Sequence, residues 1–508
     1  MFEHLLTATE LLFRPQVLGV IVMAGAYGLF VGSIPGLTAT MATALLIPVT
    51  FFMDPIPAIG AIVTMEAMAI FAGDIPGALL RIPGTPSSAA YVEESYNLTR
   101  KGQAELVLGV DLADAVIGGL FGSVVLILMA PMLAEVAIRF TSFEFFWLAL
   151  IGLSTSVMVS RGSLTKGMVS LLIGLFIATV GLDITMGYPR FNFGNVELMG
   201  GVGFIPAMIG MFGVSEVLRN VTSGQLGFTQ HVNRIGSLFK GIGSTLNRYK
   251  LNVLRGSVLG TVIGILPGAG ADIAAWVSYG LGKRLSKTPE LYGTGHIEGI
   301  VGAGSANNAA LGGAWIPALV FGIPGDSITA IVIGVLYMKG LQPGPMLFKR
   351  SPEMLYAVYE TFILANLLLL PMGYLAIKFS SRILAVPRNV LMPIILLFCI
   401  VGSFAINNTP FDVGVMLVMG ILAFVMEEND FPIAPAILGI VLGPLLENSF
   451  VVSMIKTEWN PAGFFLRPVA ALLAVVAIAL WVSPFLVRGR HLLNGGLLNG
   501  GRKPEDVP

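Results

Sequence analysis

This sequence has few charged residues and almost no cysteine. Only 11% of its 508 residues are charged and 55% are hydrophobic, whereas roughly a quarter of the residues of an ordinary soluble domain are charged. The net charge of zero and the lack of a long basic block argue against a nucleic-acid partner. The single Cys399 excludes an intramolecular disulfide and a thiolate metal cluster, and its apolar neighbours predict a buried, inert thiol. These shortages indicate a membrane protein.

The sequence also lacks the usual signs of catalysis. It contains no P-loop and no G-x-G-x-x-G pattern, so nucleotide hydrolysis is not expected. None of its four histidines falls inside a clear apolar run, which leaves an intramembrane hydrolase without a base for its nucleophile. Residues 163–166 match S-x-x-K by letter, but the companion motifs of penicillin-binding enzymes are missing. We therefore do not expect an enzyme.

Long apolar runs dominate what is present. Runs of about 20 apolar residues, the length of a membrane helix, recur between Val17 and Val487 without the period-2 alternation of strands. The sequence predicts an all-α polytopic membrane protein with roughly ten to fourteen membrane segments. The N-terminus has no basic region followed by a cleavage site, so no signal peptide is expected.

Glycine and proline break these runs at repeated positions. Residues 322–329 (GIPGDSIT) parallel residues 81–88 (RIPGTPSS) at a distance of 241 residues, from Pro83 to Pro324. An earlier Pro-Gly break, at Pro35, returns 232 residues later at Pro267. Because a bilayer offers no water to freed backbone groups, such breaks survive only where they line a cavity or are buried in protein. The pattern predicts a tandem duplication and a secondary transporter.

The repeats suggest a division of the chain. We predict a first transmembrane repeat over 1–230, a polar linker over 231–254, a second repeat over 255–458, and a C-terminal membrane helix with a polar tail over 459–508. The loop holding Lys283, Arg284 and Lys287 is basic, whereas its counterpart in the first repeat, around Asp54, is not. Under the positive-inside rule, this difference favours repeats of inverted topology. Gly256, Gly260 and Gly264 predict a close helix-packing face.

Backbone N–H groups and hydroxyls near the breaks are candidates for substrate binding. The N-terminus of a half-helix attracts a carboxylate through its free N–H groups and its dipole. The alternative is that hydroxyls after a Pro-Gly turn only cap the next helix. Arg81 adds a side chain that could hold a carboxylate through two hydrogen bonds. Alternatively, a helix would place Arg81 on the same face as Asp74, which makes Asp74 a candidate partner for an ion pair. The predicted substrate-binding residues are Pro35, Gly36, Arg81, Gly84, Thr85, Ser87, Ser88, Pro267, Gly268, Gly325, Ser327 and Thr329.

A cation site is predicted beside the second break. Sodium prefers oxygen ligands, and Ser305, Asn307 and Asn308 offer them in a glycine-rich part of an apolar run. Intramembrane amides also join helices, but two adjacent ones cannot serve a single interface. Asp326 could either neutralise a cation or cap a helix. For four further intramembrane acids, the sequence leaves open whether they are functional or paired structurally: Glu66, Asp74, Asp111 and Asp114.

Several stretches resemble the large membrane subunit of the tripartite tricarboxylate transporter (TctA-type) family. They include residues 32–37 (GSIPGL), 82–86 (IPGTP), 266–272 (LPGAGAD), 306–309 (ANNA) and 340–345 (GLQPGP). The resemblance implies an importer of small tricarboxylates or dicarboxylates in the bacterial inner membrane, driven by an ion gradient, often sodium. It also implies two partners, a small membrane subunit and a periplasmic solute-binding protein. The acids and Arg81 depart from the family pattern and leave the carboxylate and the coupling ion open.

The sequence therefore predicts a multi-pass secondary transporter that binds its substrate between the two Pro-Gly tips. The alternative is a channel, or a transporter for a different small anion coupled to protons. A channel would need a continuous polar pore rather than closed-off breaks, and the sequence lacks rings of charged residues.

Overall fold

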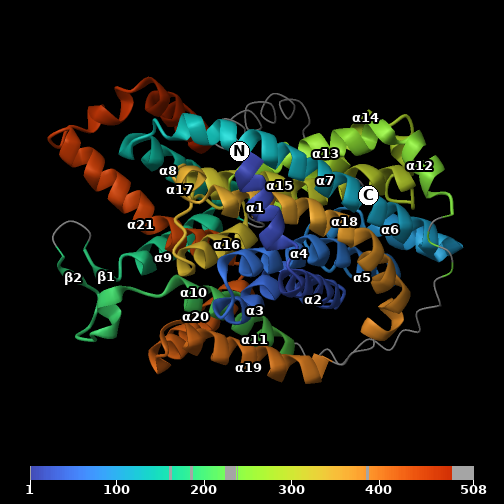
Figure 1. The fold of residues 1–508 in the computed structure, drawn as a ribbon, viewed down its shortest axis with the longest axis horizontal. Coiled ribbons are helices and arrows are strands. Elements are labelled where there is room, and N and C mark those ends of the chain that lie inside the picture. Colours follow the sequence, from blue (N-terminus) through green and yellow to red (C-terminus); the bar gives the residue numbers. More distant parts are fainter. Residues whose placement is uncertain are drawn as a thin grey trace, which may run out of the picture.

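The computed structural model describes residues 2–159, 163–183, 187–222, 236, 238, 240–384 and 388–482. The described part is an all-α bundle with one small two-stranded sheet, as Figure 1 shows. Seven residues of the predicted polar linker (231–235, 237 and 239) and the chain after residue 482 lie outside these residues. The predicted C-terminal membrane helix is described from Pro468 to Val482.

The elements up to residue 222 alternate long helices with short ones. Several long helices begin at a proline, whose fixed φ suits the first helical position. The α-helices are α1 (Phe2–Leu12), α2 (Pro15–Gly32), α3 (Ala39–Phe51), α4 (Pro55–Ala72), α5 (Asp74–Leu80), α6 (Val92–Leu98), α7 (Ala104–Ala137), α8 (Ser142–Val159), α9 (Leu164–Ala178), α10 (Phe204–Met208) and α11 (Ser215–Thr222). The other elements are η1 (Ser88–Ala90), η2 (Thr99–Gln103), η3 (Glu197–Gly200), η4 (Ile209–Val214), β1 (Gly181–Leu182) and β2 (Pro189–Arg190), with Gly181 opposite Arg190 in an antiparallel pair.

The elements after residue 240 repeat this alternation. The α-helices are α12 (Ile242–Arg248), α13 (Lys250–Ile265), α14 (Gly270–Leu285), α15 (Ile297–Phe321), α16 (Ser327–Met338), α17 (Leu347–Arg350), α18 (Pro352–Ile383), α19 (Arg388–Asn407), α20 (Pro410–Glu428) and α21 (Ile433–Lys456). Two short turns, η5 (Pro289–Leu291) and η6 (Pro461–Phe465), complete the list. The helix α13 begins inside the predicted linker.

The bundle is built around α15, which is buried from Gly299 to Val320. It packs mainly against α7 and α13 (Figure 1). The α13 glycines make this contact possible: a Cβ at Gly256, Gly260 or Gly264 would lie 2.2–2.3 Å from a carbonyl oxygen of α15. The helix-packing face predicted from these glycines is confirmed. In the same way, a Cβ at Gly28 or Gly32 of α2 would lie 2.4 Å from a carbonyl oxygen of α4.

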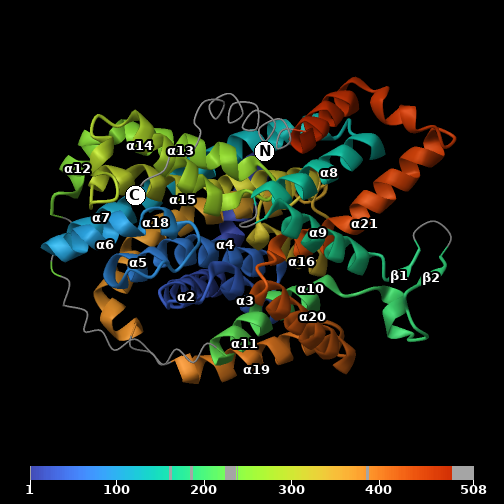
Figure 2. The ribbon, with the colours of Figure 1, turned by 180° about the vertical axis from the view of Figure 1, so that it is seen from behind.

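The last helices of the two halves are exchanged. The helix α21 packs against α8 and α9, whereas α10, η4 and α11 pack against α19 and α20. Figure 2 shows this arrangement from behind, with α21 beside α8 and α11 beside α19. Each half therefore completes the packing of the other.

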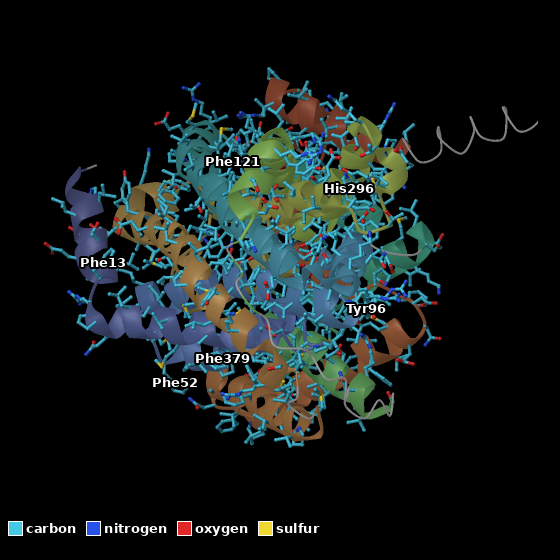
Figure 3. All side chains as sticks on the ribbon, turned by 90° about the vertical axis from the view of Figure 1, so that its right-hand side faces the viewer. Phe13, Phe52, Tyr96, Phe121, His296 and Phe379 are labelled. Atoms are coloured by element: carbon cyan, nitrogen blue, oxygen red, sulfur yellow. The ribbon has the colours of Figure 1, made fainter. Side chains whose placement is uncertain are left out.

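The outer surface is apolar enough for a bilayer. Phe13, Phe52 and Phe379 have exposed fractions of 53%, 77% and 48%, and Figure 3 shows Phe13 and Phe52 toward one edge of the molecule. Eight described helical stretches are long and apolar enough to cross a membrane, and α3, α8, α9, α16 and the helix at Pro468–Val482 are shorter apolar helices. The chain is thus an all-α polytopic membrane protein, as predicted, whereas the number of crossings and the inverted topology stay predictions.

Candidate functional site

The two predicted tips have the same backbone turn. The residue that follows α5, Arg81, has a left-handed φ of 61°, and the residue that follows α15, Gly322, has a φ of 68°. The N–H of Arg81 donates to the carbonyl of Gly77 (3.1 Å), and the N–H of Gly322 donates to the carbonyl of Ala318 (3.2 Å). Both turns close a helix C-terminus in the way that left-handed caps do. Each residue of the first turn corresponds to the residue 241 positions later in the second.

The tips also share a reciprocal cap. In the first tip, the N–H of Thr85 donates to Ser88 Oγ (3.2 Å) and the N–H of Ser88 donates to Thr85 Oγ1 (3.1 Å). In the second, the N–H of Asp326 donates to Thr329 Oγ1 and the N–H of Thr329 donates to Asp326 Oδ1, both at 2.8 Å. Asp326 therefore caps α16. The hydroxyls of Ser88 and Thr329 serve these caps, which is the alternative that the sequence left open.

Each tip folds back onto the helix segment before it. The N–H of Gly84 donates to the carbonyl of Gly73 (3.0 Å), and a Cβ at Gly84 would lie 2.6 Å from Gly73 Cα. A Cβ at Gly325 would lie 2.6 Å from Ala314 Cα. The approach is so close that only glycine fits without a shift. Gly84 and Gly325 therefore allow each tip to pack directly against the backbone of the preceding segment.

The two tips meet at one cavity of about 1010 Å³. Five of the predicted residues line it: Thr85, Ser87, Gly268, Asp326 and Ser327. Those predicted residues that do not line it are Pro35, Gly36, Arg81, Gly84, Ser88, Pro267, Gly325 and Thr329, together with Ser305, Asn307 and Asn308. Whether the lining residues hold a substrate stays a prediction.

The outer Pro-Gly breaks hold the ends of neighbouring helices. After the first break, Thr38 caps α3 by accepting the N–H of Met41 (3.1 Å), and Thr38 lines the cavity. In the second break, the carbonyl of Pro267 accepts a hydrogen bond from Thr155. The helix α14 begins at Gly270, so Asp272 lies in its first turn rather than at the N-cap, and Asp272 also lines the cavity.

The cavity contains charged residues that the sequence did not identify. Lys166 donates to the carbonyl of Asn429 (2.8 Å) and lies 3.5 Å from Asp430. Arg219 forms ion pairs with Glu216 (3.3 Å) and with Glu427. All but Asn429 line the cavity. Some of these charges are close in sequence, as Glu216 and Arg219 are, but no local pattern relates them to tips more than 70 residues away.

Arg81 does not contact the cavity, nor does it pair with Asp74 as expected. Its guanidinium bonds Glu93 at 2.7–2.9 Å, and its side chain is 58% exposed. These hydrogen bonds raise the pKa of Arg81 above its usual value. Asp74 instead accepts a hydrogen bond from the Tyr91 hydroxyl (2.7 Å). The reason is the left-handed turn at Arg81, which takes its side chain off the α5 helical face that carries Asp74.

The predicted sodium ligands are buried behind the cavity. The Asn307 amide donates to Tyr91 Oη (3.2 Å), the Asn308 amide donates to the carbonyl of Ala67 (3.4 Å), and Ser305 donates to the carbonyl of Val253 (3.2 Å). Both Asn Oδ1 atoms are buried without a hydrogen-bond partner. No group of three or more His, Cys, Asp or Glu among the described residues is placed to hold a metal ion. Sodium binding therefore stays a prediction.

Glu66 forms a contact between the two halves. It is fully buried in α4, and its Oε2 accepts a hydrogen bond from the Trp315 indole (2.9 Å), while Oε1 has no partner. No ion pair among the described residues includes it. The sequence left pairing of Glu66 open, and the structure gives it a neutral partner only.

Comparison with known proteins gives one family and two relatives. The model of the "Tripartite tricarboxylate transporter TctA family" matches residues 18–438. An uncharacterized 52.8 kDa protein in the TAR-I ttuC' 3' region of Agrobacterium vitis is 35% identical over 462 residues, which is 90% of this chain and 91% of the relative. An uncharacterized protein in the TAR-II ttuC' 3' region of the same organism is 38% identical over 212 residues, which is 42% of this chain and 88% of the relative. No solved structure matches the chain.

Proposed function

Because this chain belongs to the tripartite tricarboxylate transporter TctA family, we propose that it imports small tricarboxylates or dicarboxylates by secondary active transport. The observation that carries this proposal is the cavity of about 1010 Å³ that both tips line. Ligand sites usually measure about 300–1,000 Å³, so the cavity has room for a small carboxylate with water. Transporter sites of this kind lie where broken helices of two halves meet.

The helix ends around the cavity suit an anion. First-turn or cap residues of α3 (Thr38), α14 (Ala271) and α16 (Ser327) line it. Three helix N-termini therefore face the same space, and each contributes free N–H groups and the positive end of its dipole. Thr85 and Ser87 add hydroxyls from the first tip. Such a site can bind carboxylates without a full set of cationic side chains.

The charge of the lining favours uptake together with cations. Two basic residues line the cavity, Lys166 and Arg219, against five acids: Glu216, Asp272, Asp326, Glu427 and Asp430. A carboxylate that enters adds negative charge to a site that already has an excess of acids. A co-transported cation offsets this charge and links uptake to a cation gradient. Sodium is the cation that the family resemblance favours, and a proton is the alternative.

The remaining parts of the proposal follow from the family. We propose a bacterial inner-membrane location, with a small membrane subunit and a periplasmic solute-binding protein as partners. The tripartite family name supports an assembly of three components.

The test is carboxylate counterflow in proteoliposomes that contain this chain, its small membrane partner and the binding protein. Liposomes loaded with unlabelled tricarboxylate or dicarboxylate should take up the radiolabelled compound against its gradient, since a carrier exchanges bound substrate. Absence of counterflow for every carboxylate, with the complex shown to be intact, would contradict the proposal.

The rival functions give different results in the same vesicles. A channel would let carboxylate leak down its gradient at a rate that does not saturate, and it would show no counterflow. A transporter for another anion would leave carboxylate counterflow absent and would exchange that anion instead.

A further inference from the structure

Three buried acids lie together outside the cavity. Asp74 of α5 is 5% exposed, and Asp111 and Asp114, one turn apart on α7, are 2% and 0% exposed. We call these three residues the acid cluster. None lines the cavity, and none takes part in an ion pair among the described residues. An unpaired intramembrane acid is costly and is usually functional.

Burial without a counter-charge favours the protonated form of the acid cluster. A buried carboxylate that has neither a hydrogen-bond donor nor a cation is much less costly when it carries a proton. Both oxygens of Asp114 and Oδ1 of Asp111 are buried without a partner. A fully ionised cluster would place three charges in a site with no cation.

The groups that face the acid cluster offer no counter-charge. Tyr91 is the titratable neighbour that touches it, through a hydrogen bond from its hydroxyl to Asp74 Oδ1. Among the charged groups on elements packed against α7, Glu94 of α6 accepts from the N–H groups of Gly295 and His296, Lys378 of α18 donates to the carbonyl of Gly236, and Glu66 of α4 accepts from Trp315. Arg255 of α13 lies near Tyr292, and its Nε has no hydrogen-bond partner among the described residues.

A buried amide from the other half of the chain points to the same place. Asn307 of α15 is 0% exposed, and its Nδ2 donates to Tyr91 Oη (3.2 Å), which in turn donates to Asp74. Asn307 Oδ1 has no partner among the described atoms. The amide and the acids thus form a polar path from α15 through Tyr91 to α5 and α7, with acceptors left open at both ends.

This path joins the acid cluster to the cavity. Asp74 follows Gly73, whose carbonyl accepts the N–H of Gly84 in the first tip. Tyr91 directly follows η1, which begins at Ser88. The hydrogen bond between Asp74 and Tyr91 therefore closes the base of a loop whose residues 85–87 line the cavity. A movement of Asp74 would therefore be passed to the cavity through this short loop.

We propose that the acid cluster is the proton-coupling site of this transporter, a proposal that rests on the function given above. When the proton leaves Asp74 or Asp111, the two carboxylates repel each other, and α5 separates from α7 and moves the first tip. The proton enters from the aqueous phase on one side and leaves to the other side, so no co-reactant is needed. Carboxyl groups can carry a proton without further ligands, so at this site we take the proton as the coupling ion in place of the sodium ion that the family resemblance favours.

The test separates exchange from accumulation in the reconstituted complex. We compare wild type, Asp111→Asn and, as a matched control, Asp54→Asn, an exposed aspartate at the start of α4 that makes no side-chain cap. For one proton per substrate, an inward gradient of one pH unit should give about tenfold accumulation of carboxylate in wild type and in the control. Asp111→Asn should keep counterflow, because Asp111 does not line the cavity, but should lose the accumulation.

The outcomes are distinguishable. Absence of counterflow in wild type would overturn the proposed function itself. Proton-driven accumulation by Asp111→Asn at the wild-type level would overturn only the acid cluster, as would accumulation in wild type that follows a sodium gradient and ignores pH. Should Asp111→Asn fail to fold, Asp114→Asn serves in its place. A direct readout is proton exchange by the detergent-purified full chain when carboxylate is added to weakly buffered solution, which should fall in either variant and not in the control.

Discussion

Residues 81–88 and residues 322–329 have the same backbone turn, the same reciprocal cap and the same close approach to the preceding helix segment. Their side chains differ. The first tip has a neutral Thr85 at the cap and leads into the short η1, whereas the second has Asp326 and leads into the twelve-residue α16. The backbone geometry is therefore shared while the charges differ: the first tip has Arg81 at its turn, and the second has Asp326 at its cap.

The contacts behind the tips show the same relation. Glu66 and Asn307 are 241 residues apart, as are Asp74 and Trp315. Glu66 bonds Trp315 directly, whereas Asn307 reaches Asp74 through Tyr91. Corresponding positions therefore form two crossed contacts between the halves, and both acids belong to the first half. The matched contacts support the duplication, which stays an interpretation.

The largest effect is expected where both tips need glycine. In Gly84→Ala and Gly325→Ala, the new Cβ would lie 2.6 Å from a backbone Cα, and such overpacking costs about 1–3 kcal/mol or more. We expect a lower melting temperature in detergent and loss of counterflow in both variants. Gly19→Ala in α2, where a Cβ meets nothing within 4 Å, is the control. Tolerance of alanine at one tip only would break the equivalence of the two.

The crossed contacts should differ in strength. Trp315→Phe leaves Glu66 buried with no donor among the described residues, which costs about 1–3 kcal/mol. Tyr91→Phe should cost at least as much, because its hydroxyl donates to Asp74 and also accepts from the Asn307 amide, so two buried groups lose a partner. Thermal unfolding of both variants measures the difference. A smaller loss for Tyr91→Phe would show that the two contacts are not ranked by the number of hydrogen bonds removed.

The two caps should also be unequal. Asp326→Ala removes the cap of α16 and should cost about 0.5–2 kcal/mol, whereas Thr85→Ala precedes only the three-residue η1 and should cost less. Asp326→Asn keeps an acceptor and serves as the control. Melting temperatures of the three variants test this order, and equal losses at the two tips would contradict it.

The smallest effect is expected at the turn itself. Arg81→Gly gives the first tip the glycine that the second tip has at Gly322. The change relieves the strain of an arginine in a left-handed conformation, but it removes the exposed ion pair with Glu93. These changes oppose each other, so we expect a melting temperature and a counterflow rate close to wild type. A strong loss of counterflow with an intact fold would contradict this expectation and would support a role of Arg81 in substrate binding.

Local pattern predicted much of the fold and part of the site. Apolar run length predicted the helical membrane bundle, and the repeated Pro-Gly breaks pointed to Thr85, Ser87, Gly268, Asp326 and Ser327, which the structure places around one cavity. It could not predict Lys166 or Arg219, since they reach the cavity through long-range packing. The candidate ion pair of Asp74 and Arg81 does not form, because it requires α5 to continue as a regular helix, whereas the chain turns at Arg81.

The exchange of the last helices has a consequence for how the protein is made. The helix α9 ends at Ala178, and its main partner α21 begins at Ile433. At roughly 5–20 residues per second, about 250 residues take on the order of 10–50 s to synthesise. During that time the small-residue face of α9, with Gly174 against which Ala436 later packs, is uncovered in the membrane. During synthesis, either the insertion machinery or lipid must therefore cover this face of α9 until translation is nearly complete.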